Sequence, residues 1–484
     1  MTQKQKWVSF FSIAFGLFTA VMDASMIGIA LPSISKDFSL DLSSAAWISL
    51  VSTITVVAVL LPMGNISDRL GRKKIYLLGV IVTAIGSLLC SFSNEIFSLL
   101  ISRIIVAISA AMRMSTGLAM VMMIFKDKER GKGLGANTTT VGLAAITGPI
   151  FGGFLVGSFG WESIFITQAF LSIPAFILGY IFLDKAIVDL NQNYKKGKFD
   201  FSGSILSALA FSVLLFTINY GLVNMSNIVI SLSVLIAIVL FILFIIVESK
   251  ADQPILNVIL LKNRNFMLTM GTRMLGFLAG SSTLFLMPFY IQLVKGIAPE
   301  KAGLIIFPGA LGMSITASIS GRLSDKYGEK RFVILGLAII LISSFLFSLF
   351  SEKTSILIIV STLMMHGLGM GIWGTPNSSQ TVSIVPKNTY GSVAALLNLI
   401  RTVGMGVSIA ISSSLITLSF INFGLNSDFS SVKESFSAGQ SNAFLEGFKT
   451  TYYVLMSICI VSICLLYTSP SPRDATLSRM PSSA

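Results

Sequence analysis

The sequence predicts an all-α polytopic membrane protein, in which two bundles of six helices accompany two central extra helices. Hydrophobic residues make up 54% of the chain and charged residues 11%, and the mean hydropathy is +0.85. A soluble domain of 484 residues could not present this composition to water, so we expect lipid as its solvent. Apolar runs of the length that a bilayer requires, about 20 residues, recur along nearly the whole chain.

The apolar runs predict helices, because the strands of a membrane barrel would give short segments of alternating polarity. Each run ends where charged residues or clusters of Gly, Pro and Asn interrupt it. We expect fourteen transmembrane helices, at 7–31, 45–63, 75–92, 96–124, 134–157, 162–183, 201–222, 227–247, 266–292, 302–320, 332–350, 355–384, 392–420 and 449–466.

The basic residues predict the orientation of these helices. The net charge is +13, but most of the 34 Lys and Arg residues fall in short loops on the side of the N-terminus. Basic loops remain in the cytoplasm, so we expect both termini to be cytoplasmic. The positive charge therefore indicates membrane topology, and we expect no nucleic-acid partner.

One loop motif occurs twice. Gly64–Lys74 reads GNISDRLGRKK and Gly321–Arg331 reads GRLSDKYGEKR, with five of eleven positions identical. The copies follow the second and the tenth predicted helix, as expected if the last six helices repeat the first six. We therefore expect a six-helix bundle at 1–183, a central loop with two additional helices at 184–265, and a second bundle at 266–466.

The last residues, 467–484, do not continue the membrane pattern. They are rich in Ser and Pro and resemble a translated adapter sequence, so we expect a non-native tail. The alternative is an ordinary disordered tail.

The repeated loops supply candidate gating residues. Glycines allow tight turns and close helix ends, and Asp68 can accept hydrogen bonds from helix N-termini or from arginines across a moving interface. Alternatively, the basic residues of the loops only set the topology. The candidates are Gly64, Asp68, Arg69, Gly71, Arg72, Asp325 and Gly328.

The segment 134–157 carries closely spaced small residues and one proline. Small side chains allow another helix to lie close, and a proline leaves a carbonyl unpaired and permits a bend. Plain helix packing would use the same residues. The segment contributes Gly142, Gly148, Pro149, Gly152 and Gly153.

Asp23 is the only one of the 21 acidic residues that falls deep inside a predicted span. A charge at that depth is costly unless it is paired or reached by water, so Asp23 is a functional candidate. Arg103 lies at a similar predicted depth and is its expected partner. We interpret the pair as a proton-coupling site; the alternative is a structural aspartate neutralised by a neighbouring hydrogen bond.

Further polar residues fall inside the predicted spans. Arg113, Arg273 and Arg401 have no acidic residue near them in the sequence, and Asn398 is close to the last of these. The arginines either bond helix ends and carbonyls or line a cavity, where they would attract anionic or acceptor-rich substrates. His366 is the only histidine, and it is either a packing residue or a proton relay.

These motifs resemble the major facilitator superfamily. Gly64–Lys74 is similar to its signature loop, and Gly142–Gly153 is similar to a motif of its drug:proton antiporters. Asp23–Pro32 and Asn398–Gly404 resemble segments of the fourteen-span antiporter family. After Arg103 that family usually continues to Gln-Gly, whereas this chain has Val106-Ala107, so the role of the glutamine is not carried over.

The resemblance implies a major facilitator fold and proton-driven efflux of small lipophilic compounds or antibiotics by alternating access. It implies a bacterial plasma membrane, with substrate, protons and the lipid bilayer as partners, and the proton gradient in place of a cofactor. A proton-coupled uptake symporter is the alternative, against which the Gly148-Pro149 motif counts.

A membrane-embedded enzyme is the remote alternative. One histidine and one buried acid cannot build a Ser/His, paired-Asp or HExxH site, so we expect no enzyme. No GxxxxGK[ST] loop is present, so we expect no ATP coupling. Cys90, Cys459 and Cys464 show no metal-binding spacing, so we expect no metal.

Overall fold

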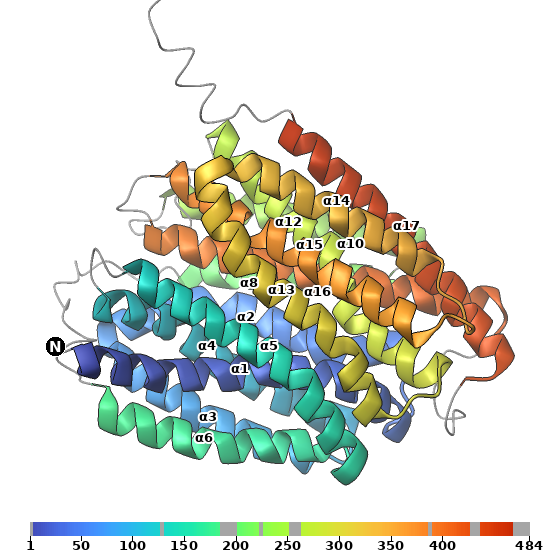
Figure 1. The fold of residues 1–484 in the computed structure, drawn as a ribbon, viewed down its shortest axis with the longest axis horizontal. Coiled ribbons are helices and arrows are strands. Elements are labelled where there is room, and N and C mark those ends of the chain that lie inside the picture. The colour runs from blue at the N-terminus through green and yellow to red at the C-terminus, as the bar shows by residue number, and fades with distance from the viewer. Residues whose placement is uncertain are drawn as a thin grey trace, which may run out of the picture.

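The computed structural model describes residues 3–125, 130–183, 201–221, 226–250, 263–385, 390–425 and 436–467. The regular elements within these ranges are helices (Figure 1). The expected tail lies outside the described residues except for Tyr467. Parts of the expected central loop, 184–200 and 251–262, lie outside them as well.

Six helices precede the central region and six follow it. The first six are α1 (Gln3–Asp37), α2 (Leu42–Leu70), α3 (Arg72–Ser91), α4 (Ile96–Ile124), α5 (Arg130–Phe159) and α6 (Glu162–Phe182). The central elements are α8 (Phe201–Phe216), the π-helix η2 (Thr217–Gly221) and α10 (Asn227–Lys250). The last six are α12 (Arg264–Phe289), continued by the π-helix η3 (Tyr290–Val294), α13 (Pro299–Tyr327), α14 (Glu329–Ser348), α15 (Ile356–Ser383), α16 (Tyr390–Asn422) and α17 (Ala438–Tyr467).

The predicted fold class is confirmed. In the described part of the chain, 13 helices are long and apolar enough to cross a membrane. The remaining predicted span, 201–222, corresponds to the shorter apolar helix α8 and its extension η2. Several helices exceed the predicted apolar runs: α1 begins at Gln3 instead of residue 7, for example. A helix continues into its polar ends, which hydropathy alone does not detect.

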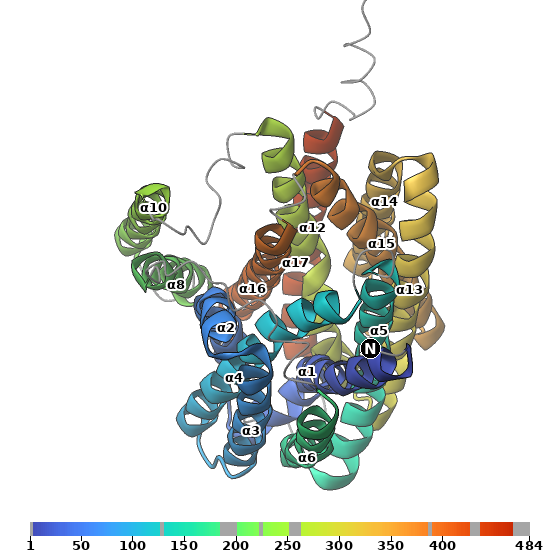
Figure 2. The same ribbon diagram turned by 90° about the vertical axis from the view of Figure 1, so that its left-hand side faces the viewer.

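Helices of the first six and last six pack in the same pattern. In the first six, α1 contacts α4, α5 and α6, while α3 contacts α4 and α6. In the last six, α12 contacts α15, α16 and α17, while α14 contacts α15 and α17. Between the sets, α5 packs on α13 and α2 packs on α16 (Figure 2). We refer to α1–α6 and α12–α17 as the N-terminal and C-terminal halves.

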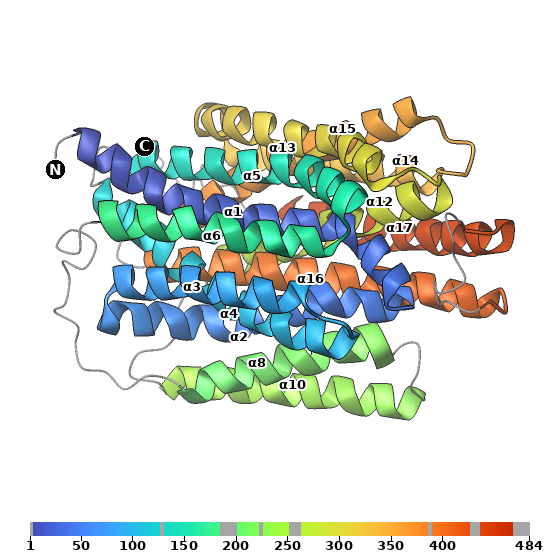
Figure 3. The same cartoon turned by 90° about the horizontal axis from the view of Figure 1, so that it is seen from below.

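The two central helices lie at one edge of the molecule. α8 packs on α2 and also touches α16, next to the α2–α16 contact between the halves. α10 packs on α8 and η2 at the outer edge of the molecule (Figure 3). Most of its side chains are exposed. Its high hydropathy fits a surface in contact with lipid.

Among the described residues, buried apolar side chains of the two halves share one cluster, and other clusters belong to one half each. On the side opposite the N-terminus, one large cluster includes residues of both halves, among them Leu31, Leu42, Leu293 and Phe420. On the N-terminal side, each half has a separate cluster. These are Phe10, Ile13, Ile124 and their neighbours in the N-terminal half, and Phe266, Val385, Val393 and their neighbours in the C-terminal half. The apolar core therefore holds the halves together at the far side.

Candidate functional site

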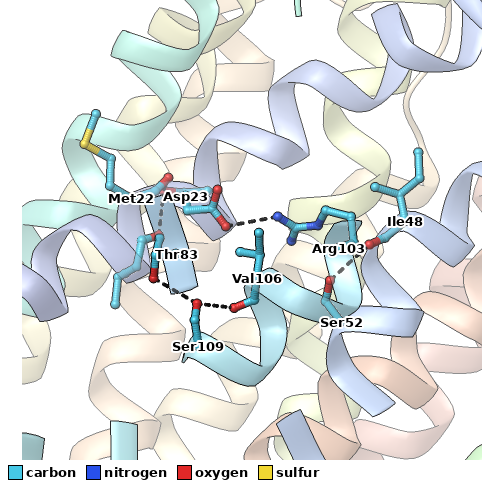
Figure 4. Close-up of polar contacts among 10 residues, drawn as sticks. Met22, Asp23, Ile48, Ser52, Thr83, Arg103, Val106 and Ser109 are labelled. Atoms are coloured by element: carbon cyan, nitrogen blue, oxygen red, sulfur yellow. Dashed lines mark hydrogen bonds and ion pairs between the residues drawn. The ribbon is translucent and has the colours of Figure 1, made fainter. Parts of the chain in front are cut away.

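The buried ion pair joins α1 to α4. Asp23 and Arg103 are 6% and 5% exposed, and Nη1 of Arg103 donates to Oδ2 of Asp23 at 3.2 Å (Figure 4). The guanidinium also lies 6.0 Å from the ring centre of Phe165. The sequence thus placed these two charges at matching depths, and the structure brings them together.

The pair leaves some of its hydrogen-bonding capacity unused. Oδ1 of Asp23 and Nε of Arg103 are buried and have no hydrogen-bond partner among the described residues. A buried polar atom without a partner costs free energy, so this arrangement favours a change that would satisfy it. Entry of a water molecule that donates to Oδ1 would be such a change.

The glycines of α5 pack on α1 directly beside Asp23. A Cβ added to Gly148 would lie 1.8 Å from Oγ of Ser25 and 3.2 Å from the carbonyl oxygen of Met22. A Cβ added to Gly152 would lie 3.0 Å from Cα of Met26. Residues without side chains are therefore required where α5 touches the helix that carries the carboxylate.

The same stretch of α5 also touches α13 of the other half. A Cβ on Gly153 would lie 2.5 Å from the carbonyl oxygen of Pro299, and a Cβ on Gly303 would lie 2.1 Å from that of Pro149. Further along, a Cβ on Gly142 would lie 2.8 Å from Oγ of Ser314. All five predicted α5 residues thus lie at close helix contacts, on α1 or on α13.

The repeated loops have the same backbone geometry. Gly71 has φ 100° and donates from its N–H to the carbonyl of Ser67 at 3.0 Å; Gly328 has φ 95° and donates to that of Ser324 at 2.8 Å. Glycine is favoured at such positive φ angles. Each serine also donates from its hydroxyl to the carbonyl three residues earlier, Gly64 in the first copy. The shared Gly, Ser and Gly positions therefore build one type of turn.

Charged residues of these loops are only partly described. The side chains of Asp68, Arg69 and Asp325 lie outside the described part of the structure. Arg72 donates to the sulfur of Met123 on α4. The expected gating contact of Asp68 therefore stays a prediction.

Arg113 is bonded within the N-terminal half. Its Nη1 donates to the carbonyl of Gly16 at 3.1 Å and to Oγ1 of Thr19 at 3.2 Å, and the residue is 4% exposed. These contacts agree with the first of the two options from the sequence, in which buried arginines bond carbonyls. Nearby, the Tyr76 hydroxyl donates to the carbonyl of Ser12 at 3.0 Å.

Arg273 and Arg401 lie in the C-terminal half on α12 and α16. Arg273 donates to the carbonyl of Leu397 at 3.0 Å and to Oγ of Ser378 at 2.8 Å. Arg401 is partly buried, and its Nε has no hydrogen-bond partner among the described residues. Asn398 is partly buried on the same helix.

His366 connects three helices of the C-terminal half. It is 6% exposed, Nε2 lies 2.9 Å from the carbonyl oxygen of Gly280, and Nδ1 lies 2.9 Å from Oγ of Ser343. The carbonyl must accept, so Nε2 carries a proton. These fixed partners agree with the packing interpretation, and we assign no proton transfer to this residue.

Some polar contacts could not be anticipated from the sequence. Oγ1 of Thr83 and Oγ of Ser109 lie 2.8 Å apart between α3 and α4, below the ion pair (Figure 4). In the C-terminal half, hydroxyls of Ser282, Ser408 and Ser412 bond one another between α12 and α16. Ser and Thr are common in all the predicted spans, so no sequence signal singled out these residues. Among the described residues, no group of three His, Cys, Asp or Glu side chains could hold a metal ion.

Known proteins provide an independent comparison. The family model described as Major Facilitator Superfamily matches residues 13–409. The riboflavin transporter RibZ of Clostridioides difficile (strain 630) is 30% identical over 475 residues, 98% of this chain and 100% of RibZ. The multidrug resistance protein Stp of Mycobacterium tuberculosis (strain CDC 1551 / Oshkosh) is 26% identical over 403 residues, 83% of this chain and 74% of Stp.

A solved structure shares the fold. The crystal structure of a bacterial homolog to the human lysosomal transporter Spinster, in an inward-facing and unoccupied conformation, covers 100% of both chains with a TM-score of 0.68 and 15% identity. This likeness shows the fold and carries no information on the substrate.

Proposed function

Because the chain belongs to the Major Facilitator Superfamily, and is therefore a multi-pass membrane transporter of small molecules and not an enzyme, we propose that it exports lipophilic compounds in exchange for protons. We place it in a bacterial plasma membrane with both termini in the cytoplasm, as its basic loops predict. The export direction draws on the Gly148-Pro149 motif and on relatives such as Stp.

The position of α5 is the observation that carries the proposal. On one face α5 packs against α1 beside Asp23, and on another it packs against α13 of the opposite half. Because glycines make both contacts, the backbones approach closely, and a small shift of α1 must displace α5 or separate the two helices. The helix with the carboxylate is thus mechanically connected to the contact between the halves.

The ion pair supplies the proton step. While Asp23 is ionised, its attraction to Arg103 holds α1 against α4; a proton on Asp23 removes that attraction. The weakened α1–α4 contact then permits α1 and α5 to shift against α13. Proton binding on one side and release on the other would link this shift to the gradient.

The separate apolar clusters on the N-terminal side support alternating access. In the described part of the chain, the cluster shared by the halves includes Leu31, Leu42, Leu293 and Phe420 at the far side, so we expect the halves to part at the N-terminal side. With cytoplasmic termini, this arrangement is inward-facing. Export then requires the far-side cluster to open as the N-terminal sides close.

The test compares Asp23→Asn with Asp41→Asn in proteoliposomes. Resistance profiling in a pump-deficient bacterium first identifies a transported compound. We expect Asp23→Asn to abolish transport driven by an imposed proton gradient, and Asp41→Asn to leave it unchanged, because Asp41 only caps α2 at Ser44 and asparagine also caps. Undiminished gradient-driven transport by Asp23→Asn would remove the proton role.

Uptake of riboflavin is the second candidate. The observation that favours it is the identity of 30% with RibZ along the full length of that protein. Expression in a riboflavin auxotroph that lacks its own uptake system tests it. Growth on low riboflavin would favour uptake over export, and absence of growth with a functional membrane-inserted protein would reject it.

A further inference from the structure

Two arginines in the C-terminal half have no carboxylate partner. Arg273 is 6% exposed and Arg401 is partly buried, and among the described residues neither forms an ion pair. By contrast, Arg113 of the N-terminal half lies within the electrostatic reach of Asp23. A charge inside a protein requires compensation, so positive charge at Arg273 and Arg401 calls for an anion from elsewhere.

Arg273 contacts α16 one helical turn before Arg401. Nε of Arg273 donates to the carbonyl oxygen of Leu397 at 3.0 Å. In an α-helix the carbonyl of residue i faces the N–H of residue i+4, so this oxygen lies at the level of Arg401. The charge of Arg401 also acts on Arg273. Two like charges are therefore held in the same part of the interior.

In the described part of the chain, buried polar atoms without partners occur on Asn377, which contacts Arg273, and on Arg401 itself. Nη1 of Arg273 lies 3.4 Å from Oδ1 of Asn377, and because arginine only donates, the other amide atom of Asn377 is a donor. That atom, Nδ2, has no partner among the described residues, although Asn377 is 0% exposed. Oε1 of Gln380, which is 3% exposed, and Nε of Arg401 are buried without partners as well.

We propose that Arg273, Asn377 and Arg401 bind the acidic end of an amphiphilic organic anion, and that such anions are the transported substrate class. A carboxylate would supply both the missing charge and acceptors for the donors of Asn377 and Arg401. The ring of Phe277, whose centre lies 5.1 Å from the Arg273 guanidinium, provides an apolar surface beside the charge. The inference rests on the transport function proposed above and specifies its substrate.

The position of these polar residues suits the binding of a transported ligand. Leu397 belongs to the separate apolar cluster on the N-terminal side of the C-terminal half, where the halves are not joined by a shared core. The proposed ligand residues all belong to α12, α15 and α16 of the C-terminal half, so their arrangement remains intact when the halves move. The anion and the proton would then bind in different halves, and movement between the halves links them.

The experiment measures equilibrium binding of two probes to the full chain in lipid nanodiscs, without a proton gradient. Radiolabelled 1-naphthylacetate and 1-naphthylacetamide differ in charge but hardly in shape. We expect the carboxylate to bind at least about tenfold more tightly than the amide, a difference of about 1.4 kcal/mol. Arg401→Gln should weaken carboxylate binding about tenfold and leave amide binding unchanged, while Arg401→Lys should retain part of the preference.

Lys353→Gln is the matched control, because Lys353 is exposed in the loop after α14 and its loss removes the same charge. Equal binding of the two probes, absence of carboxylate binding, or an equal effect of Lys353→Gln would overturn the inference. Binding is measured without a proton gradient, so its result does not depend on proton coupling. A chain that binds the carboxylate but shows no gradient-driven transport would contradict proton-coupled export and leave the anion site supported.

Discussion

Replacing Gly148 with alanine tests whether α5 must lie against α1 beside the ion pair. The added Cβ would lie 1.8 Å from Oγ of Ser25, 2.8 Å from Cβ of Ser25 and 3.2 Å from the carbonyl oxygen of Met22. The hydroxyl of Ser25 bonds carbonyls of its own helix and can rotate away. Its Cβ is fixed by the backbone, so the clash is relieved only if the helices separate.

The magnitude follows from two opposing effects. Overpacking of this kind costs about 1–3 kcal/mol, whereas alanine in place of glycine stabilises a helix by up to about 1 kcal/mol. We expect Gly148→Ala to lower the free energy of unfolding by about 1–2 kcal/mol. Gly271→Ala is the matched control on α12, because nothing lies within 4 Å of its Cβ, and it should be neutral or stabilising.

The assay is thermal unfolding of the purified chain, followed by gradient-driven transport. Gly148→Ala should lower the unfolding temperature and the transport rate, and Ser25→Gly in the same chain should restore both in part, because it removes two of the three close contacts. If Gly148→Ala behaved like Gly271→Ala in both measurements, the close α1–α5 contact would not matter for stability or transport, and the coupling argument would fail.

Three further perturbations address other contacts. Asp23→Leu or Arg103→Leu alone should lower the free energy of unfolding by about 3–5 kcal/mol, because each leaves a buried charge unpaired. The double variant should lose less than the sum of the two single losses, as measured by thermal unfolding, and additive losses would contradict the pairing. Gly303→Ala should slow transport, because its Cβ would lie 2.1 Å from the carbonyl oxygen of Pro149. Gly374→Ala is the control, because a Cβ there meets nothing within 4 Å. Equal transport rates of the two variants would show that transport does not depend on the close α5–α13 contact. Arg113→Gln should lower the yield of folded protein without altering the resistance profile, because the side chain bonds Gly16 and Thr19; a changed profile at normal yield would instead indicate contact with substrate.

The helices could be predicted from the sequence because the membrane imposes the same requirement on each span. The weakest prediction was 201–222, where the structure has a short α-helix followed by a π-helix. Hydropathy reports the length of an apolar run and not its hydrogen-bond register. The loop repeat was more informative, since Gly71 and Gly328 occupy the same unusual φ region.

Site residues were predictable one at a time, but their partners were not. Asp23 and Arg103 could be paired because few charges exist at that depth, which leaves little choice. The glycines of α5 gave no indication of which helix each would touch, because spacing along a helix does not identify its neighbour. For the same reason the sequence could not reveal that Arg273 bonds the carbonyl of Leu397, one helical turn before Arg401.

The difference between the halves bears on where coupling resides. At its closest contact with α1, α5 packs beside the carboxyl group of Asp23, whereas the corresponding contact of α16 with α12 is made by hydroxyls of Ser282, Ser408 and Ser412. Hydroxyl bonds do not change with a proton gradient, so in the proposed mechanism the C-terminal half has no equivalent of Asp23 at this contact. Proton binding should therefore alter the α1–α4 and α1–α5 contacts while the α12–α16 contact stays intact. The C-terminal half would then serve as the fixed binding frame for the substrate, against which the N-terminal half moves.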